Sequence, residues 1–288
     1  MPQPVISGAP LTCKFGGLAL PNGQGTMTQI NLNDGTNWQW QQFLADDDYV
    51  QYSVGQLVWR ARSTVIGRDR KARVLTLPMR YQEASSSPSA ALGVQTALLD
   101  QAGQQQLTFD NSTYILANYS GLKKRTMIKK FSPFYWSFDL DFLCPEPYFK
   151  DISSTTISNQ ALTSGSATTF NVTYAGSIFG EPVWTLTIPV GNTAPIQSFA
   201  LSNTMSGETI SVTFPGNLAG STAWTITIDS GKLTVADQNG LQYDFTGSFP
   251  LLYPPAGQVN AFSATLTPAS GTATSCTIGG SVVNRWLL

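Results

Sequence analysis

An alternating run near the end of the chain is the feature that most constrains its fold. Trp224-Thr-Ile-Thr-Ile-Asp229 has large apolar side chains at every second position, with hydrophilic residues between them. A period of two in aromatic and β-branched residues is typical of a strand with one buried face. Asn239-Gly240 is a strong hairpin signal, and Tyr253-Pro-Pro255 must leave a sheet because prolines donate no ladder hydrogen bonds. This stretch therefore predicts antiparallel β structure.

The whole C-terminal half repeats this pattern. Segments rich in β-forming residues recur about every ten residues with Gly, Asn or Pro between them, which is typical of a β-sandwich or barrel. We expect strands at Thr168–Tyr174, Val183–Val190, Ile196–Ser202, Thr209–Phe214, Thr222–Ile228, Lys232–Ala236, Leu241–Thr246, Phe262–Thr267 and Thr277–Trp286.

The N-terminal half predicts about seven strands and one helix, so the chain is mainly β with a β-rich α+β first domain. The helix is expected at Ser89–Ala102, because Pro88 suits its first turn and Gly103 suits its end. Leu92, Leu98 and Leu99 roughly share one of its faces.

Charge is spread unevenly and indicates where the domains divide. Residues 1–150 hold 14 Lys and Arg against 11 Asp and Glu, a net +3, and residues 151–288 hold 2 against 6, a net −4. Between them, Asp151–Gly165 is polar and short of charge, which suits a connector or a first edge strand. We therefore expect an N-terminal domain at 1–150 and a C-terminal domain at 151–288.

Composition argues against catalysis and favours an assembly subunit. The chain has no histidine, which removes the commonest general base and metal ligand, and neither a Gly-x-Ser-x-Gly elbow nor a P-loop is present. We expect no enzyme activity, no cofactor and no metal. Only 11% of residues are charged and the net charge is −1, which protects a free monomer poorly against self-association.

The remaining composition indicates where the protein is made. Three cysteines at distant positions indicate buried thiols from a reducing cytoplasm rather than a disulfide framework. No signal peptide is recognisable at the N-terminus, and no apolar run approaches eighteen residues, so membrane insertion is not expected.

Several segments, taken in order, resemble one family. They are Asp229-Ser-Gly-Lys-Leu-Thr-Val235 followed by Asn239-Gly240, then Gly247-Ser-Phe-Pro-Leu-Leu252, a Pro-Pro-x-Gly turn and a closing Arg285-Trp-Leu287. This order resembles the C-terminal module of the distal tail proteins of long, flexible-tailed bacteriophages. Phe138-Asp-Leu-Asp-Phe-Leu-Cys-Pro-Glu-Pro-Tyr-Phe149 resembles the end of that family's N-terminal domain.

The resemblance implies a structural role in a virion. It implies a galectin-like sandwich in the C-terminal half and N-terminal domains that close a homohexameric ring continuing the tail tube. The ring subunit would lie at the distal tip of the tail and join the tail tube protein to tail-tip and receptor-binding proteins. Its lumen would let DNA pass without specific nucleic-acid binding.

The densest basic stretch consists of Arg60, Arg62, Arg68, Arg70, Lys71, Arg73 and Arg80, and Arg68–Lys71 is expected as a polar turn. Two interpretations stay open: a charged hairpin, or a hairpin that reaches a neighbouring subunit and pairs with an acidic loop. That loop is Asp46, Asp47 and Asp48. Adjacent residues of an extended chain point to opposite faces, so these three favour a solvated loop over a cation site.

A second basic run holds Lys123, Lys124, Arg125, Lys129 and Lys130. Lysines on a strand edge deter wrong pairing, so a solvated edge is the favoured interpretation. The alternative is that these residues face the DNA channel of the ring.

Two other functions compete with the structural one. A carbohydrate-binding adhesion module would use Trp184, Trp224, Tyr243, Tyr253 or Trp286 to stack on sugars, although alternation places the first two in the core. A glycoside hydrolase would use Asp139 and Asp141, which we expect instead on the wet face of an amphipathic strand.

Overall fold

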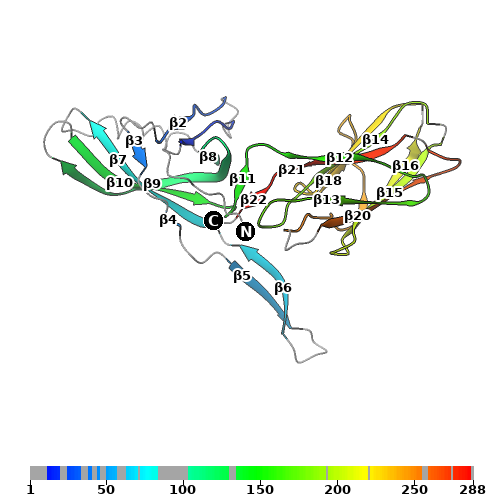
Figure 1. The fold of residues 1–288 in the computed structure, drawn as a ribbon, viewed down its shortest axis with the longest axis horizontal. Helices are drawn as coiled ribbons and strands as arrows, with labels where there is room; N and C mark the ends of the chain where they lie inside the picture. Colours follow the sequence, from blue (N-terminus) through cyan, green and yellow to red (C-terminus); the bar gives the residue numbers. More distant parts are fainter. Residues whose placement is uncertain are drawn as a thin grey trace. The chain divides into compact units, whose positions relative to one another are not determined.

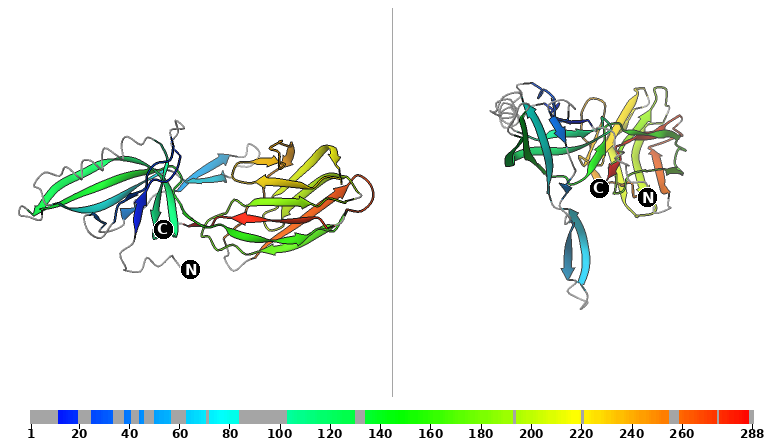
Figure 2. Two further views of the ribbon diagram at one scale, coloured as in Figure 1. Left: turned by 90° about the horizontal axis from the view of Figure 1, so that it is seen from above. Right: turned by 60° about the vertical axis from the view of Figure 1, so that its left-hand side comes forward.

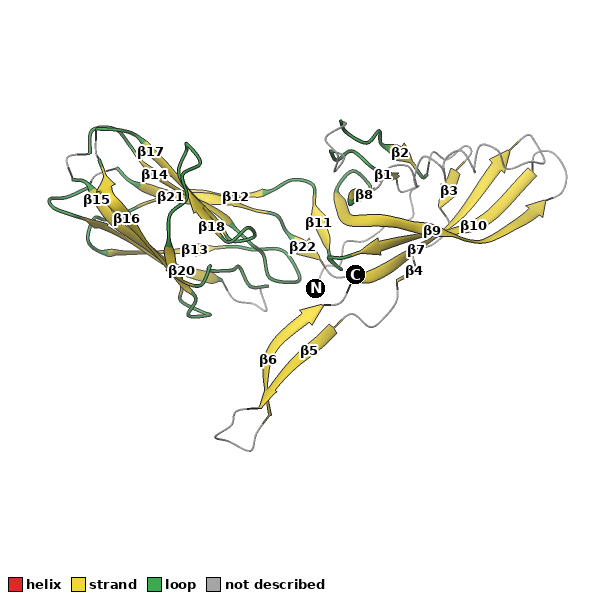
Figure 3. Ribbon diagram, turned by 180° about the vertical axis from the view of Figure 1, so that it is seen from behind, coloured by secondary structure: helices red, strands yellow, loops and turns green. Residues whose placement is uncertain are grey.

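The computed structural model describes most of the chain. The described residues are 12–19, 25–33, 38–40, 44–45, 50–56, 63–70, 72–83, 103–129, 134–192, 194–219, 221–254, 259–273 and 275–286. Every regular element in these ranges is a strand, as Figure 3 shows, so the predicted mainly β fold is confirmed. The predicted helix Ser89–Ala102 lies outside them. No described helix is long and apolar enough to cross a membrane.

The chain divides into two compact units, one ending at Ile152 and the other starting at Ser153. The first unit is built around one antiparallel sheet with the strand order β2-β1-β8-β9-β10-β7-β3 (Figure 1). Strand β11 adds beside β9, and β4 beside β7. These strands are β1 Cys13–Phe15, β2 Ile30–Asn31, β3 Trp38–Trp40, β4 Leu44–Ala45, β7 Arg73–Glu83, β8 Gln105–Phe109, β9 Thr113–Lys129, β10 Phe134–Cys144 and β11 Phe149–Asp151.

The first unit's core lies on one face of this sheet. Leu75, Leu77 and Met79 alternate along β7 and are fully buried. They lie directly opposite Phe142, Leu140 and Phe138 of β10, which are also buried. Large apolar pairs that are both adjacent across strands and removed from water stabilise a sheet through packing as well as through its ladder.

Strand β9 pairs with β8 and β11 near its start and with β10 farther along. It has 17 residues, and its first five pair with β8 while residues from Asn118 onward pair with β10. Residues 126–143, for which the sequence predicts one long strand or two, include the end of β9 and most of β10. A separate two-stranded sheet is formed by β5 Val50–Gln56 and β6 Ser63–Arg70.

The second unit consists of two five-stranded antiparallel sheets, the layers of a β-sandwich (Figures 1 and 2). One sheet has the order β12-β21-β14-β17-β18, with β12 Thr155–Ala161, β14 Val183–Ile188, β17 Trp224–Asp229, β18 Thr234–Ala236 and β21 Thr277–Val282. The other has the order β13-β20-β15-β16-β19, with β13 Ala167–Val172, β15 Ile196–Asn203, β16 Thr209–Leu218, β19 Phe245–Gly247 and β20 Asn260–Pro268. The short strand β22 Arg285–Trp286 follows.

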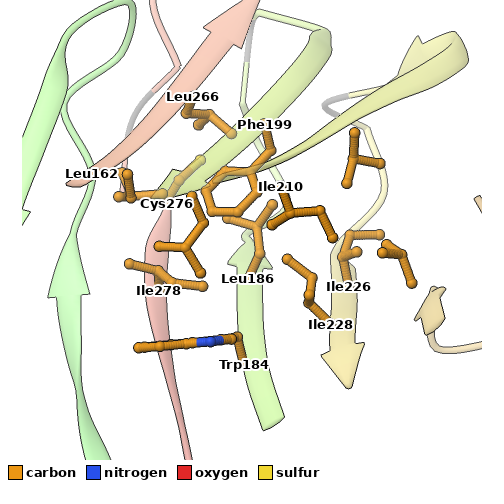
Figure 4. Close-up of a cluster of buried hydrophobic side chains, with 14 of the residues drawn as sticks. Leu162, Trp184, Leu186, Phe199, Ile210, Ile226, Ile228, Leu266, Cys276 and Ile278 are labelled. Carbon is orange, nitrogen blue, oxygen red and sulfur yellow. The ribbon is translucent and has the colours of Figure 1, made fainter. Parts of the chain in front are cut away.

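The core of the sandwich lies between the two sheets. Trp184, Leu186 and Ile188 alternate along β14 with no exposed surface, and Ile226 and Ile228 of β17 are at most 1% exposed. Figure 4 shows Trp184, Leu186, Ile226 and Ile228 in this core. The indole of Trp184 packs edge-on against Phe262, with ring centroids 4.7 Å apart. Its neighbour on β21 is Gly280, which leaves room for a close backbone approach. The alternation predicted at the sequence level is confirmed here.

The predicted hairpin at Asn239-Gly240 is present but short. Its two sides pair at one antiparallel bridge, Ala236 to Gln242, with backbone hydrogen bonds from the Asp237 amide to the Leu241 carbonyl and from the Tyr243 amide to the Val235 carbonyl. Asp237 Oδ1 accepts the amides of Asn239 and Leu241 at 2.8 and 2.9 Å. The side chain thus takes donors that a ladder would use. The following strand, β19, pairs with β16 in the other sheet.

Candidate interaction surfaces

The second basic run lies on β9, apart from Lys130, which falls outside the described residues. In this part of β9 the only ladder among described strands is with β10, where Lys123 lies opposite Asp139 and Lys129 opposite Tyr135. Lys124 and Arg125 lie between those two positions. The described ladder of β8 reaches only as far as Ala117. Lysine-rich sequence on a strand with one described neighbour fits the edge interpretation, and a channel-facing role stays a prediction.

The predicted turn at Arg68–Lys71 is wrong for its first three residues. Arg68, Asp69 and Arg70 belong to β6, and Arg68 and Arg70 lie opposite Tyr52 and Val50. These charged residues therefore belong to a strand of the two-stranded sheet instead of a turn. The other candidate interface residues, Arg60, Arg62, Asp46, Asp47 and Asp48, lie outside the described residues.

Arg73, from the same basic stretch, has a different environment. It is 2% exposed, and its guanidinium carbon lies 5.0 Å from the Phe149 ring centroid. Its register partner is Cys144. Burial raises the pKa of the Cys144 thiol to about 12, while the Arg73 charge and a backbone hydrogen bond lower it by less. Arg73 is thus part of the interior of the first unit.

The two carboxylates considered for glycosidase chemistry differ in environment. Asp141 is 3% exposed and accepts a hydrogen bond from Thr76 Oγ1 at 2.7 Å. The expectation of a wet face is therefore wrong for Asp141. Burial, then the nearby Asp141 charge, raises the pKa of Tyr119 to about 12. Asp139 is only partly buried, so the two acids do not share one exposed face.

The aromatic residues considered for sugar binding in the sandwich mostly pack in or against its core. Trp184 has no exposed surface on which a sugar ring could stack. Trp224 packs against the core, and its Nε1 donates to the Ala219 carbonyl at 3.0 Å. Phe245, on the short edge strand β19, is 36% exposed and contacts Phe249 with ring centroids 4.8 Å apart.

A carboxylate that sequence reasoning missed organises one end of the sandwich. Glu208 accepts hydrogen bonds from the Tyr253 hydroxyl at 2.6 Å, the Leu251 amide at 3.0 Å and the Ser206 hydroxyl at 2.9 Å. Burial, then this carboxylate, raises the pKa of Tyr253 to about 12. The Tyr253 amide in turn donates to Asn260 Oδ1 at 2.7 Å. This network holds the segment before Pro254 against the loop between β15 and β16.

A second polar cluster holds the last described strand. The Arg285 guanidinium forms an ion pair with Glu181 and lies 5.8 Å from the Phe179 ring centroid. The Arg285 amide donates to the Tyr174 hydroxyl at 3.1 Å. Space beside that tyrosine is tight, because a Cβ at Gly176 would lie 2.2 Å from its hydroxyl oxygen. Arg285 thus serves the fold of this unit.

A groove opens between β12 and β13, the edge strands of the two sheets. Its volume is about 300 Å³, and its lining is uncharged. The residues are Thr155, Thr156, Ile157, Ser158, Gln160, Phe170, Asn171, Val172 and Thr173. Within the described ranges no group of three or more His, Cys, Asp and Glu side chains is placed to hold a metal ion.

The three thiols are all buried and unpaired with one another. Burial raises the pKa of each, and in Cys276 a hydrogen bond from Asn192 opposes that effect. A buried thiol of raised pKa carries little reactive thiolate near neutral pH.

Comparison with solved structures identifies proteins of similar architecture. The crystal structure of the SPP1 Dit (gp 19.1) protein, described as a paradigm of the hub adsorption apparatus of phages infecting Gram-positive bacteria, matches with a TM-score of 0.60. The match covers 96% of this chain and 99% of that one, at 12% sequence identity. The chain has the fold of this Dit protein.

Two structures of the phage P2 baseplate in its activated conformation, with Ca and with Sr, also match, each at 8% identity over 94% of this chain and 97% of theirs. Their TM-scores are 0.40 and 0.41. No family model and no curated protein sequence matches.

Proposed function

We propose that the chain is a distal tail protein, a structural subunit of a phage tail tip. The observation that carries this is the Dit likeness, which extends over both units and leaves almost none of either chain unmatched. The sequence segments that resemble the distal tail family give separate support. They include the turn between β17 and β18 and the strand β22. In this role the protein performs no chemistry.

The subunit forms a homohexameric ring through its first unit and joins the tail tube protein to tail-tip and receptor-binding proteins. Closed cyclic symmetry needs heterologous contacts, so one surface must complement a different one on the neighbour. The β5–β6 hairpin supports such a contact, because two strands without a described third neighbour offer free edges. The lumen passes DNA, and the basic part of β9 is the candidate channel lining.

Particle mass and symmetry test the proposal directly. Six copies of the 31.0 kDa chain give a particle of about 186 kDa, measurable by native mass spectrometry, with six-fold rings in negative-stain images. Replacing Arg68 and Arg70 with Glu should dissociate the ring, whereas Lys232→Glu, an exposed charge of the second unit, should leave it intact. A chain that stays monomeric at high concentration would contradict the ring.

A further inference from the structure

The edges of the sandwich are unequal. On one side its sheets end in β18 and β19, which have three residues each. On the other side they end in β12 and β13, with seven and six residues. Among the described strands, β12 pairs with β21 and β13 pairs with β20, and neither has a second neighbour. Short edges resist unwanted pairing, and long ones invite it.

The long edges also lack the usual protection. Thr155–Ala161 and Ala167–Val172 contain no charged residue and no proline. The chain does place charge on another long strand edge, since the part of β9 whose one described neighbour is β10 carries Lys123, Lys124, Arg125 and Lys129. Unprotected edges of this length are a liability in a free chain and a template for pairing in an assembly.

The groove between these two edges has an apolar floor and a hydrogen-bonding rim. Ile157, Phe170 and Val172 are 6%, 8% and 5% exposed, and they line it from both strands. The rim consists of exposed hydroxyl and amide side chains, including Ser158 and Asn171. A strand entering it lies beside two strands that each lack a second described neighbour, with apolar surface beneath, so its alternate side chains would face the floor and the solvent.

We propose that this groove binds one extended, uncharged segment of another protein as an added strand. The occupant is a lone segment because an edge strand of a second folded copy carries its own sheet with it and cannot enter between β12 and β13. It spans about four to six residues, because the lining residues lie within 155–160 on one side of the groove and within 170–173 on the other. It alternates small apolar with neutral polar side chains, because a charge buried against this uncharged lining would have no partner.

The source of the bound segment rests on the proposed function. We assign the segment to a terminal arm or loop of a neighbouring tail-tip protein. Strand addition suits that joint, since main-chain hydrogen bonds supply affinity and alternate side chains supply specificity.

The test uses the purified full chain and two sets of probes. The first is a blocked heptapeptide of alternating Thr and Val, with a matched peptide carrying Glu at the Val positions. The second is a set of overlapping ten-residue peptides from the other tail proteins of the same virus. Hydrogen exchange should slow in residues 155–161 and 167–173 with the neutral heptapeptide and one tail peptide, and not with the Glu peptide.

Variants separate the groove from other sites. Ser158→Lys and Asn171→Lys, both at exposed positions, should weaken peptide binding about tenfold or more by placing a charge in the groove. Thr246→Lys, on the short edge β19, should leave binding unchanged. Unaltered exchange of the buried β14 amides checks that each variant is folded.

Three results would overturn the proposal: no slowing in β12 and β13, slowing that survives Asn171→Lys, or equal loss in Thr246→Lys. A neutral saccharide that binds on a glycan array and is lost in the same variants, without peptide binding, would make the groove a sugar site instead. Ring formation is measured without peptides or these variants. A chain that forms no ring can therefore be distinguished from a groove that binds no peptide.

Discussion

The hydrogen bond from Tyr253 to Glu208 gives the most quantitative prediction. A hydrogen bond to a charged acceptor contributes about 1.5–3 kcal/mol, and both residues here are half-buried, which favours the lower part of that range. Tyr253→Phe removes the donor, and Glu208→Gln removes the charge while keeping the shape. We expect each to destabilise the second unit, with a coupling energy of about 1–2 kcal/mol in the double-mutant cycle.

The assay is native-state hydrogen exchange of the β14 peptide 183–188 in urea, because those amides lie in the buried centre of that unit. Asp244→Asn, at an exposed carboxylate of the same unit, is the matched control and should be additive with Tyr253→Phe. Additivity of Tyr253→Phe and Glu208→Gln within about 0.5 kcal/mol would refute the reasoning.

The same pair predicts a pH dependence. The pKa of Tyr253 is raised from 10.0 to about 12, chiefly by burial and then by Glu208, so the folded state favours the neutral phenol. Its stabilising contribution is fully present below pH 10 and is lost as pH rises toward 12. Glu208→Gln should lower this pKa. An absorbance titration of the unchanged chain and of Glu208→Gln, each compared with the same protein carrying Tyr253→Phe, isolates the Tyr253 phenol. A Tyr253 midpoint that Glu208→Gln leaves unchanged would count against the role of the carboxylate.

Three further predictions concern the core and the turns. Gly247→Ala should destabilise by about 2–4 kcal/mol in urea unfolding, because φ is +93° and the new Cβ would lie 2.0 Å from the Thr209 carbonyl. Gly240→Ala, at φ +83° in open space, should cost only about 1–2 kcal/mol, and equal costs would contradict the clash. Trp184→Ala should cost about 3–5 kcal/mol and the partly exposed Trp224→Ala less, by the same measurement. The three thiols should resist a disulfide reagent at pH 8 until the chain unfolds, and rapid native labelling would show that one is accessible.

Local pattern was sufficient for the strands whose faces differ clearly. The strand expected at Thr222–Ile228 is β17, which runs from Trp224 to Asp229, and the strand expected from Val183 is β14. Both have a strict period of two, with one face in the core, and tertiary context only reinforces that preference.

The same local reasoning could not predict which strands pair with one another. Consecutive strands β12 and β13 belong to different sheets, and β19 crosses to β16 instead of continuing the turn at Asn239-Gly240. The burial of Asp141 was hidden as well, because its partner Thr76 is 65 residues away in the sequence. Partner choice depends on contacts distant along the chain, which a local period does not encode.

No sequence pattern indicated the groove between β12 and β13 or the hydrogen bonds of Glu208. Glu208 looks like one more acid in a polar loop, and its three donors come from two separate segments. The groove depends on the ends of two sheets lying side by side, which only the fold supplies.

The position of β21 has a consequence for synthesis. It lies between β12 and β14, so residues 277–282 complete a sheet whose other strands were made more than a hundred residues earlier for β12 and almost ninety earlier for β14. Among the described strands, β12 therefore lacks its partner until β21 has been made, whereas β14 also pairs with β17, which is made before β21. Premature termination between β12 and Thr277 should leave the second unit incomplete and prone to aggregation through the unpaired edges of β12 and β14.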